Sequence, residues 1–178
     1  PTMFQTVLSI VDAFYNLMSL VAITPRKSIC VHAGIPKEIR EFKLLNSIPK
    51  PHYNTLLLED QKQIKKLREI FKQVRWNDPT EEPSVDENSR SYHGYFYYTE
   101  SETQKFLSLY GFKRIYRSHE DPRGGFQEVF PDKLFHFFSS EPYLGKIEKA
   151  TIIHETSEKI LVRDLDFNIH RDITPKSY

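Results

Sequence analysis

The first third of the chain combines one long apolar segment with one short β-branched run. Residues 6–22 carry apolar side chains at helical spacing and the pattern ends before Pro25, which predicts a helix with a buried apolar side. The Ile-Cys-Val run within residues 28–32 predicts a buried strand, and Gly34 then turns the chain into a loop. Residues 36–54 contain three prolines and little periodicity, so we expect mostly loop with one short helix.

The middle of the chain predicts two helices separated by a long polar segment. Residues 58–74 place isoleucine, leucine, phenylalanine and valine on one side and lysines on the other, which is typical of an amphipathic surface helix. Residues 77–91 are polar, contain two prolines and predict a loop. Thr99 is followed three residues later by Glu102, the spacing of a capping box, and the helix that begins there is expected to end at Gly111.

Short runs of β-branched and aromatic residues predict five strands in the remainder, at 113–118, 126–130, 134–138, 149–154 and 159–165. The second and third of these form one hairpin, and the last two form another. Helices therefore come first and strands late, which predicts a mixed α+β fold in sheet-and-helix layers rather than an alternating βα fold. We expect one domain over residues 1–170 and a tail over residues 171–178.

Composition indicates a globular protein whose small net charge does not favour strongly charged partners. The 178 residues are enough for one domain with a buried core, and 39% hydrophobic and 28% charged residues are ordinary proportions. A net charge of +1 gives no global field that would favour nucleic acid or an acidic membrane surface as a partner. The single cysteine, Cys30, excludes an internal disulfide framework and fits a reducing, cytoplasmic environment.

The apolar segment over residues 4–23 invites comparison with a membrane span. A span needs about 20 largely uncharged apolar residues, and Asp12, Asn16 and Ser19 interrupt this segment. We therefore expect a buried amphipathic helix and no membrane contact, and we find no signal-peptide pattern. The first residue is Pro1 rather than methionine, so we expect a processed or partial sequence.

Two of the seven histidines, His32 and His119, each follow a short apolar strand. A strand end fixes the backbone while the side chain faces a cleft, and neutral imidazole is a good ligand for divalent metals. These two histidines lie far apart in the sequence, so spacing alone leaves a metal role and a structural role open. His93 stands near Arg90 in the predicted loop, which leaves a site role open for it. The other histidines are expected to be ordinary surface or hydrogen-bonded residues.

Five short motifs occur in a fixed order along the chain. They are Val31-His32-Ala33-Gly34, Arg75-Trp76-Asn77-Asp78-Pro79, Arg90 ahead of Gly94-Tyr95-Phe96, Arg117-Ser118-His119-Glu120 with Gly125-Phe126 after it, and Phe138-Ser139-Ser140-Glu141-Pro142-Tyr143. Each motif is modest evidence, whereas the order and the spacing together form a specific signal. Over residues 6–155 the chain resembles the C-terminal part of the phosphoprotein phosphatase family. These are metal-dependent Ser/Thr phosphatases of the calcineurin-like metallophosphoesterase superfamily, and the family includes archaeal and bacterial members.

The resemblance implies a fold and a reaction. The fold is a two-sheet α/β/β/α metallophosphoesterase sandwich, of which this chain would hold the second sheet and its flanking helices. The reaction is hydrolysis of phosphoserine and phosphothreonine in proteins by a water molecule that two divalent metal ions activate, with Mn²⁺, Fe²⁺/Fe³⁺ or Zn²⁺ as the ions. The implied partner is a phosphoprotein substrate, and a regulatory subunit is left open.

The resemblance also implies roles for four residues. His32 and His119 are expected to be two ligands of one metal. Arg90 is expected to clamp phosphate, because a planar guanidinium grips two phosphate oxygens at once. The hydroxyl of Tyr143 is expected to line the phosphate pocket, and residues 76–79 are expected to be structural, near the wall of the cleft.

Several positions depart from the family pattern. Ser91 replaces a glycine, Glu141-Pro142 replaces Pro-Asn, and Leu144 stands where many eukaryotic members have cysteine. The family's Gly-Asp-x-His-Gly, Gly-Asp-x-x-Asp-Arg-Gly and Gly-Asn-His-Glu motifs are not in this sequence. They would supply the other metal ligands and the histidine that protonates the leaving group. Those ligands would therefore lie outside this chain, and we expect weak metal affinity and little activity from the chain alone.

Two other functions are compatible with the sequence. One is a dinucleoside polyphosphate hydrolase of the same superfamily, because His-Ala-Gly-Ile-Pro occurs in that group too, although the motifs at 75–79 and 138–143 fit the protein phosphatases better. The other is a catalytically incomplete domain that binds a partner, because the Asp- and Asn-rich motifs are absent and Glu141-Pro142 departs from the pattern. In that second case an exposed apolar surface is expected.

Overall fold

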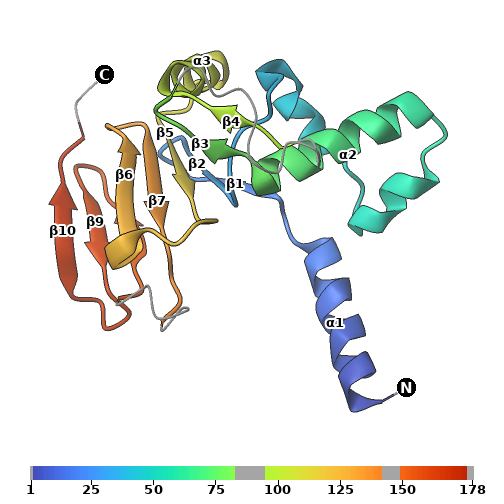
Figure 1. The fold of residues 1–178 in the computed structure, drawn as a ribbon, viewed down its shortest axis with the longest axis horizontal. Helices are drawn as coiled ribbons and strands as arrows, with labels where there is room; N and C mark the ends of the chain where they lie inside the picture. The colour runs from blue at the N-terminus through green and yellow to red at the C-terminus, as the bar shows by residue number, and fades with distance from the viewer. Residues whose placement is uncertain (1, 83–94, 142–148, 176–178) are drawn as a thin grey trace.

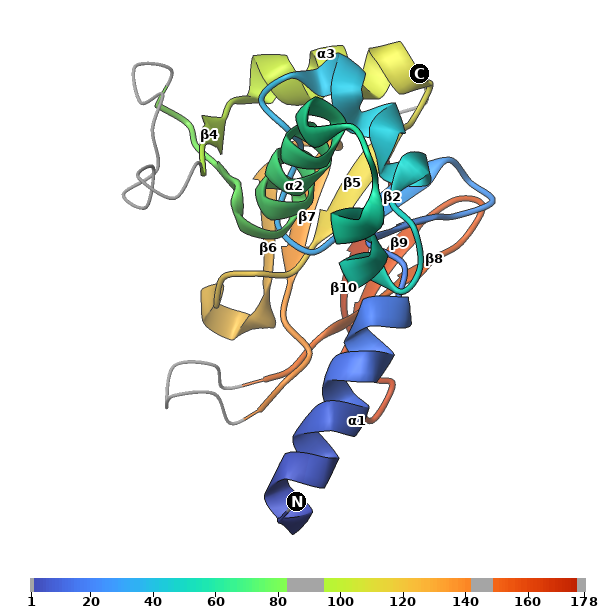
Figure 2. The ribbon, with the colours of Figure 1, turned by 90° about the vertical axis from the view of Figure 1, so that its right-hand side faces the viewer.

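The structure, a computed structural model, describes residues 2–82, 95–141 and 149–175. A helical part and a two-sheet part lie side by side, and one helix extends away from both (Figure 1; Figure 2). Most of the helices precede most of the strands in the chain, as the sequence predicts. This architecture confirms the predicted mixed α+β fold class.

A five-stranded sheet forms the centre of the fold. Its strands in spatial order are β1 (Val21–Ile23), β2 (Ser28–Val31), β5 (Arg114–Arg117), β7 (Leu134–Phe137) and β6 (Phe126–Phe130). The three middle strands, β2, β5 and β7, are parallel, and each edge strand runs antiparallel to its neighbour. Parallel strands bring their carboxyl ends to one edge of a sheet, so the segments that follow β2 and β5 lie next to each other.

A second, three-stranded antiparallel sheet packs on one face of the central sheet. Its strands in spatial order are β10 (Ile169–Ile173), β9 (Ile160–Arg163) and β8 (Ile152–Glu155). Ile160 of β9 packs with Tyr116 and Phe135 of the central sheet in a buried cluster. Strand β10 runs three residues into the segment that the sequence predicts as a tail, because residues 171–173 pair with β9.

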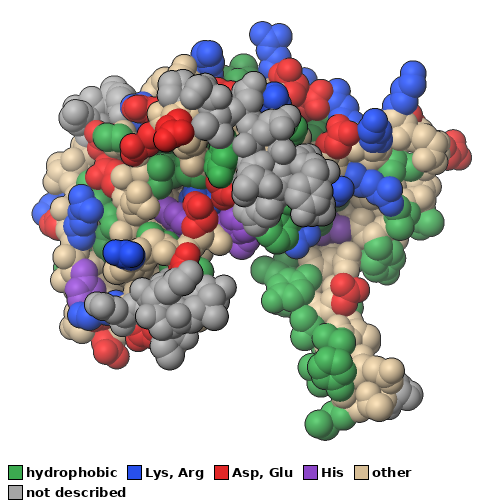
Figure 3. All heavy atoms as spheres, in the orientation of Figure 1, with side chains coloured by type: hydrophobic (Ala, Val, Ile, Leu, Met, Phe, Trp, Pro, Cys, Tyr) green, Lys and Arg blue, Asp and Glu red, His purple; other side chains and the backbone are tan. Residues whose placement is uncertain are grey.

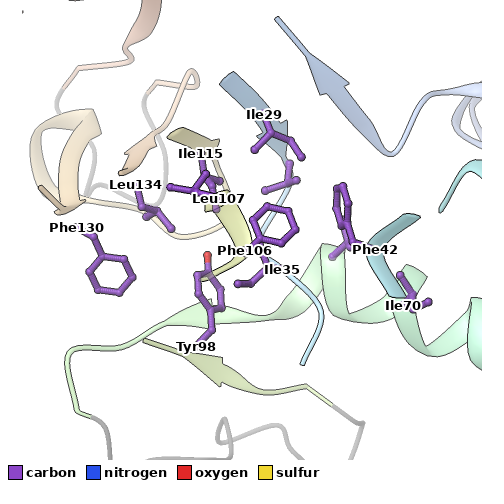
Figure 4. Packing of buried hydrophobic residues seen from close by; sticks show 12 residues of the cluster. Ile29, Ile35, Phe42, Ile70, Tyr98, Phe106, Leu107, Ile115, Phe130 and Leu134 are labelled. Carbon is purple, nitrogen blue, oxygen red and sulfur yellow. The ribbon is translucent and has the colours of Figure 1, made fainter. Parts of the chain in front are cut away.

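Helices cover the opposite face of the central sheet. They are α2 (Gln61–Trp76), α3 (Glu100–Tyr110) and the 3-10 helix η1 (Ile39–Ser47). A second 3-10 helix, η2 (His52–Leu57), contacts α2 and α1 instead. A buried cluster joins Ile29 and Ile115 of the sheet to Ile70 of α2, Phe106 of α3 and Phe42 of η1 (Figure 4). Burial contributes roughly 1.5–3 kcal/mol for each such side chain, so this cluster is the main core. Within the described residues, helices, central sheet and second sheet thus form an α/β/β stack.

Helix α3 begins and ends where the sequence predicts. The segment predicted as a loop before it differs from its prediction in part. The backbone N–H of Thr99 donates to the carboxylate of Glu102 at 2.7 Å, and Gly111 ends the helix with φ of 67°. The segment predicted as a polar loop begins with a short strand, β3 (Asp78–Pro79), which pairs in parallel with β4 (Tyr97–Tyr98). Both strands belong to the wall of the site described below.

The first helix differs most from its prediction. Helix α1 (Met3–Leu17) begins at a capping box, but it extends from the body and none of its residues is buried (Figure 1). Figure 3 shows hydrophobic side chains along it, and Phe14 is 61% exposed. The predicted burial is therefore wrong, because among the described elements the main contact of α1 is with η2. The helix is also shorter than predicted, and residues 21–23 form β1 instead.

Helix α1 is apolar but short. Within the residues that the structure describes, no helix has both the length and the apolar character that crossing a membrane requires.

One buried ion pair ties the two sheets together. Arg114 of β5 donates from Nη1 to Oε1 of Glu155 on β8 at 2.5 Å, and Ser28 Oγ of β2 donates to the same oxygen at 2.6 Å. Burial by itself raises the pKa of the Glu155 carboxyl, but the hydrogen bonds from Ser28 and Arg114 outweigh it and hold that pKa below its usual range. The ionised carboxylate is therefore part of the folded structure at neutral pH.

Candidate metal centre

Two histidines meet at the carboxyl edge of the central sheet. His32 directly follows β2, and His119 follows β5 by two residues, so the parallel pairing of these strands brings the histidines together. His32 Nε2 lies 3.1 Å from His119 Nδ1, and the ring centroids are 5.0 Å apart. The fold thus unites the two predicted ligands, which are 87 positions apart in the sequence.

The distance between these two nitrogens fits a common metal ion. With metal–nitrogen bonds of about 2.0–2.1 Å, nitrogens 3.1 Å apart subtend about 95–100° at the metal, between octahedral and tetrahedral values. Burial, followed by the nearby positive charges of Arg75 and Arg117, lowers the pKa of His32, which favours the neutral imidazole that binds metals. Among the described residues, no group of three or more histidine, cysteine or acidic side chains is placed to hold a metal. The described part of the chain therefore offers a pair of ligands rather than a full set.

A network of charged side chains, with the buried Arg117 at its centre, lies next to His119. The guanidinium of Arg117 is fully buried; its Nη2 donates to Asp78 Oδ1 at 2.7 Å and its Nη1 donates to Glu120 Oε2 at 2.6 Å. Asp78 Oδ1 in turn lies 3.8 Å from His119 Nε2. His119 therefore faces His32 with one ring nitrogen, and its other ring nitrogen lies on the side of a carboxylate, beyond direct hydrogen-bond distance.

The loop that carries His32 is held by the motif at residues 75–79. Asn77 Nδ2 donates to the backbone oxygen of Ile35 at 2.7 Å, and Tyr98 Oη donates to the backbone oxygen of Ala33 at 3.2 Å. A Cβ on Gly34 would lie 2.3 Å from the Tyr98 ring and 2.7 Å from the Asn77 oxygen, so only glycine permits this close approach. The His-Ala-Gly motif and the Trp-Asn-Asp-Pro motif thus form one structural unit.

His136 is a supporting residue whose role the sequence did not reveal. It lies in β7, is 2% exposed, and its Nε2 accepts the backbone N–H groups of His119 and Glu120 at 3.4 and 3.2 Å. Burial, followed by the charge of Arg117, lowers the pKa of His136 to about 3, so its ring is neutral and can accept both bonds. The available signal was a histidine inside the apolar run Leu-Phe-His-Phe, where a polar residue needs a partner.

Of the remaining predicted site residues, the structure describes Trp76 but not Arg90 or Tyr143. Trp76 stacks on Tyr95 with centroids 5.4 Å apart and presents its ring at 89° to His119, with centroids 5.1 Å apart, so it forms a wall beside the histidine pair. Arg90 and Tyr143 lie outside the described residues. Their roles in phosphate binding stay predictions.

Comparison with known proteins supports the resemblance. No protein-family model matches the chain. The chain is 26% identical over 161 residues to the serine/threonine-protein phosphatase BSL2 of Arabidopsis thaliana, an alignment that covers 87% of this chain and 14% of that protein. The chain therefore spans about one seventh of the length of this curated relative.

The fold has a counterpart among solved structures. A protein serine/threonine phosphatase from Saccharomyces cerevisiae with similarity to human phosphatase PP5 superposes with a TM-score of 0.67 at 20% identity, covering 98% of this chain and 55% of that one. In sequence and in fold, the chain is thus similar to the C-terminal part of Ser/Thr phosphoprotein phosphatases, as its motifs indicate.

Proposed function

We propose that this chain contributes to a metal-dependent phosphatase that hydrolyses phosphoserine and phosphothreonine in proteins. The observation that carries the proposal is the 3.1 Å approach of His32 and His119 at the carboxyl edge of the sheet. In α/β folds this edge is where ligands bind, and the similarity to Ser/Thr phosphatases gives the pair its chemical context. The proposed setting is the cytoplasm, in keeping with the single cysteine.

In this proposal His32 and His119 bind one metal ion of a two-metal site. Imidazole is a good ligand for Zn²⁺ and iron, whereas Mn²⁺ also requires oxygen ligands, and the other ligands come from outside this chain. When bound, two such ions lower the pKa of water and neutralise the charge that develops on phosphate. The metal affinity of the chain alone is accordingly weak.

The other residues of the site support His119 or bind the phosphate. Asp78, paired with Arg117, places its carboxylate 3.8 Å from the ring of His119, and His136 accepts the backbone N–H of His119. Trp76 lies beside the site, with its ring edge-on to the imidazole of His119. Arg90 and Tyr143 are proposed to grip the phosphate, the first with two parallel N–H donors and the second with its hydroxyl.

Metal titration of the chain tests the proposal. Isothermal titration with Mn²⁺ and with Zn²⁺ is expected to show weak binding of one ion, which His32→Ala and His119→Ala each abolish. His154→Ala, in the second sheet, serves as the control and is expected to bind as the unmodified chain does. Binding that survives both site variants would contradict the assignment of the pair. Mn²⁺-dependent turnover of a phosphoserine peptide by the chain alone would contradict the need for ligands outside it.

A further inference from the structure

A basic hollow lies at the edge of the central sheet opposite the histidine pair. Lys27 immediately precedes β2 and Lys113 immediately precedes β5, whereas His32 and His119 follow these strands. The hollow has a volume of about 620 Å³, and five of its lining side chains are cationic: Arg26, Lys27, Lys113, Arg114 and Lys159. Glu158 also lines it, so positive charge predominates. A concave surface of one sign concentrates its field and favours ligands of the opposite charge.

The two turns that frame this basic hollow are held in place by hydrogen bonds. Between β1 and β2, Lys27 donates its backbone N–H to the Thr24 oxygen and accepts the backbone N–H of Lys113, both at 2.9 Å. Between β8 and β9, Thr156 Oγ1 accepts the backbone N–H of Lys159 at 2.9 Å. A site built on fixed turns loses little conformational entropy when a ligand binds.

The positive groups of the hollow differ in how they are paired. Arg114 is 7% exposed; its Nη1 is bound to Glu155, but its buried Nε has no hydrogen-bond partner within the described ranges. Lys159 is paired with Asp172 at 2.7 Å. For Lys27 and Lys113, the described ranges contain no acidic partner within ion-pair distance. Lys27 and Lys113 are exposed, and no ion pair with a described carboxylate offsets their charge, so the wall of this hollow favours an anion.

An apolar hollow adjoins the basic one and narrows the choice of anion. It also has a volume of about 620 Å³, shares Pro25 and Arg26 with the basic hollow, and is lined mainly by Tyr116, Phe137 and Ile153 between the two sheets. The carboxylate of Glu155 also lines it and is paired with Arg114. A ligand that fills both hollows must carry negative charge and, next to it, an apolar group. A polypeptide that carries acidic side chains next to an apolar one offers that combination at the spacing of neighbouring side chains.

We propose that the basic hollow binds an aspartate- and glutamate-rich segment of a partner protein. The carboxylates meet Arg26, Lys27 and Lys113, and a neighbouring apolar side chain enters the hollow between the sheets. This docking site goes beyond the proposed phosphatase activity and lies at the opposite edge of the sheet from the metal pair, so it functions whether or not metal is bound.

Fluorescence anisotropy with defined probes tests the proposal on the full chain. The probe is a fluorescein-labelled peptide of six glutamates followed by one phenylalanine; a six-lysine peptide and a thymidine oligonucleotide are the comparison probes. We expect binding of the acidic peptide alone, weakened about tenfold or more in Lys27→Glu/Lys113→Glu. The control Lys65→Glu/Lys72→Glu makes the same change in charge on the exposed side of α2 and is expected to alter binding less than twofold.

Three results would overturn the docking site. They are absence of binding by the acidic peptide, an equal loss in both double variants, and tighter binding of the oligonucleotide. If Lys27→Glu/Lys113→Glu does not fold, as circular dichroism would show, the exposed single variant Arg26→Glu replaces it, with an expected loss of about threefold or more. Zn²⁺ titration of the folded variants is expected to be unchanged, which separates failure of this site from failure of the metal centre.

Discussion

Replacing Arg117 tests how the structure supports the candidate metal centre. The guanidinium is fully buried, and it faces a buried carboxylate, Asp78, at 2.7 Å and a half-exposed one, Glu120, at 2.6 Å. Arg117→Met keeps much of the apolar volume and removes the charge. Asp78 then stays buried and loses the ion pair with Arg117, and breaking a buried ion pair costs about 3–5 kcal/mol in a typical protein. The exposed pair with Glu120 adds at most about 1 kcal/mol.

The same reasoning predicts strong coupling between the two buried partners. In Arg117→Met/Asp78→Asn the buried carboxylate is removed and only the half-exposed Glu120 loses its partner, so the double variant is expected to recover about half or more of the lost stability. Urea denaturation followed by circular dichroism measures the four proteins of this cycle, at low temperature because a loss of this size is a large part of ordinary stability. A loss below about 1 kcal/mol in Arg117→Met, or strictly additive losses in the cycle, would refute the network.

Three further predictions concern single positions. His136→Leu removes the acceptor behind the backbone of His119 and is expected to weaken Zn²⁺ binding about 10-fold or more, with His136→Gln nearer to the unmodified chain; equal losses in the two would contradict this role. The pKa of Glu155 is lowered in the folded state, so the stabilisation from its carboxylate is present above the unfolded pKa of about 4.3 and is lost as pH falls through the folded pKa. Glu155→Gln is therefore expected to be less stable at pH 7, and its urea midpoint is expected to depend less on pH below pH 5. A urea midpoint that falls more steeply with acid in the variant would contradict the lowered pKa. Gly34→Ala is expected to cost about 1–3 kcal/mol, since its Cβ would meet Tyr98 at 2.3 Å, and an unchanged melting temperature would contradict the close approach.

Local signals predict the elements whose ends are set by neighbouring residues. The Thr99–Glu102 capping box and Gly111 fix α3 at both ends, and the hairpin of β6 and β7 follows the two short runs of apolar and aromatic residues on either side of its turn. The burial of α1 could not be predicted in this way. An apolar stripe shows that a helix prefers a partner surface, but only the tertiary structure shows whether a surface is there.

In the candidate site, too, some residues could be predicted from local sequence signals and others depend on tertiary contacts. His32 and His119 were found because strand ends and motif order point to them, and parallel pairing of β2 with β5 then brings them together. His136 and the Arg117–Asp78 pair were not assigned their supporting roles, because those roles depend on contacts across three separate strands. Periodicity predicts which face a side chain occupies, but it does not identify the partner across the sheet.

The most direct test of the central claim is a crystal structure of the protein soaked with Mn²⁺ and measured at the manganese absorption edge. The account predicts one anomalous peak within about 2.0–2.3 Å of both His32 Nε2 and His119 Nδ1. A peak that contacts one of these nitrogens without the other, or a peak elsewhere with none between the two rings, would contradict it.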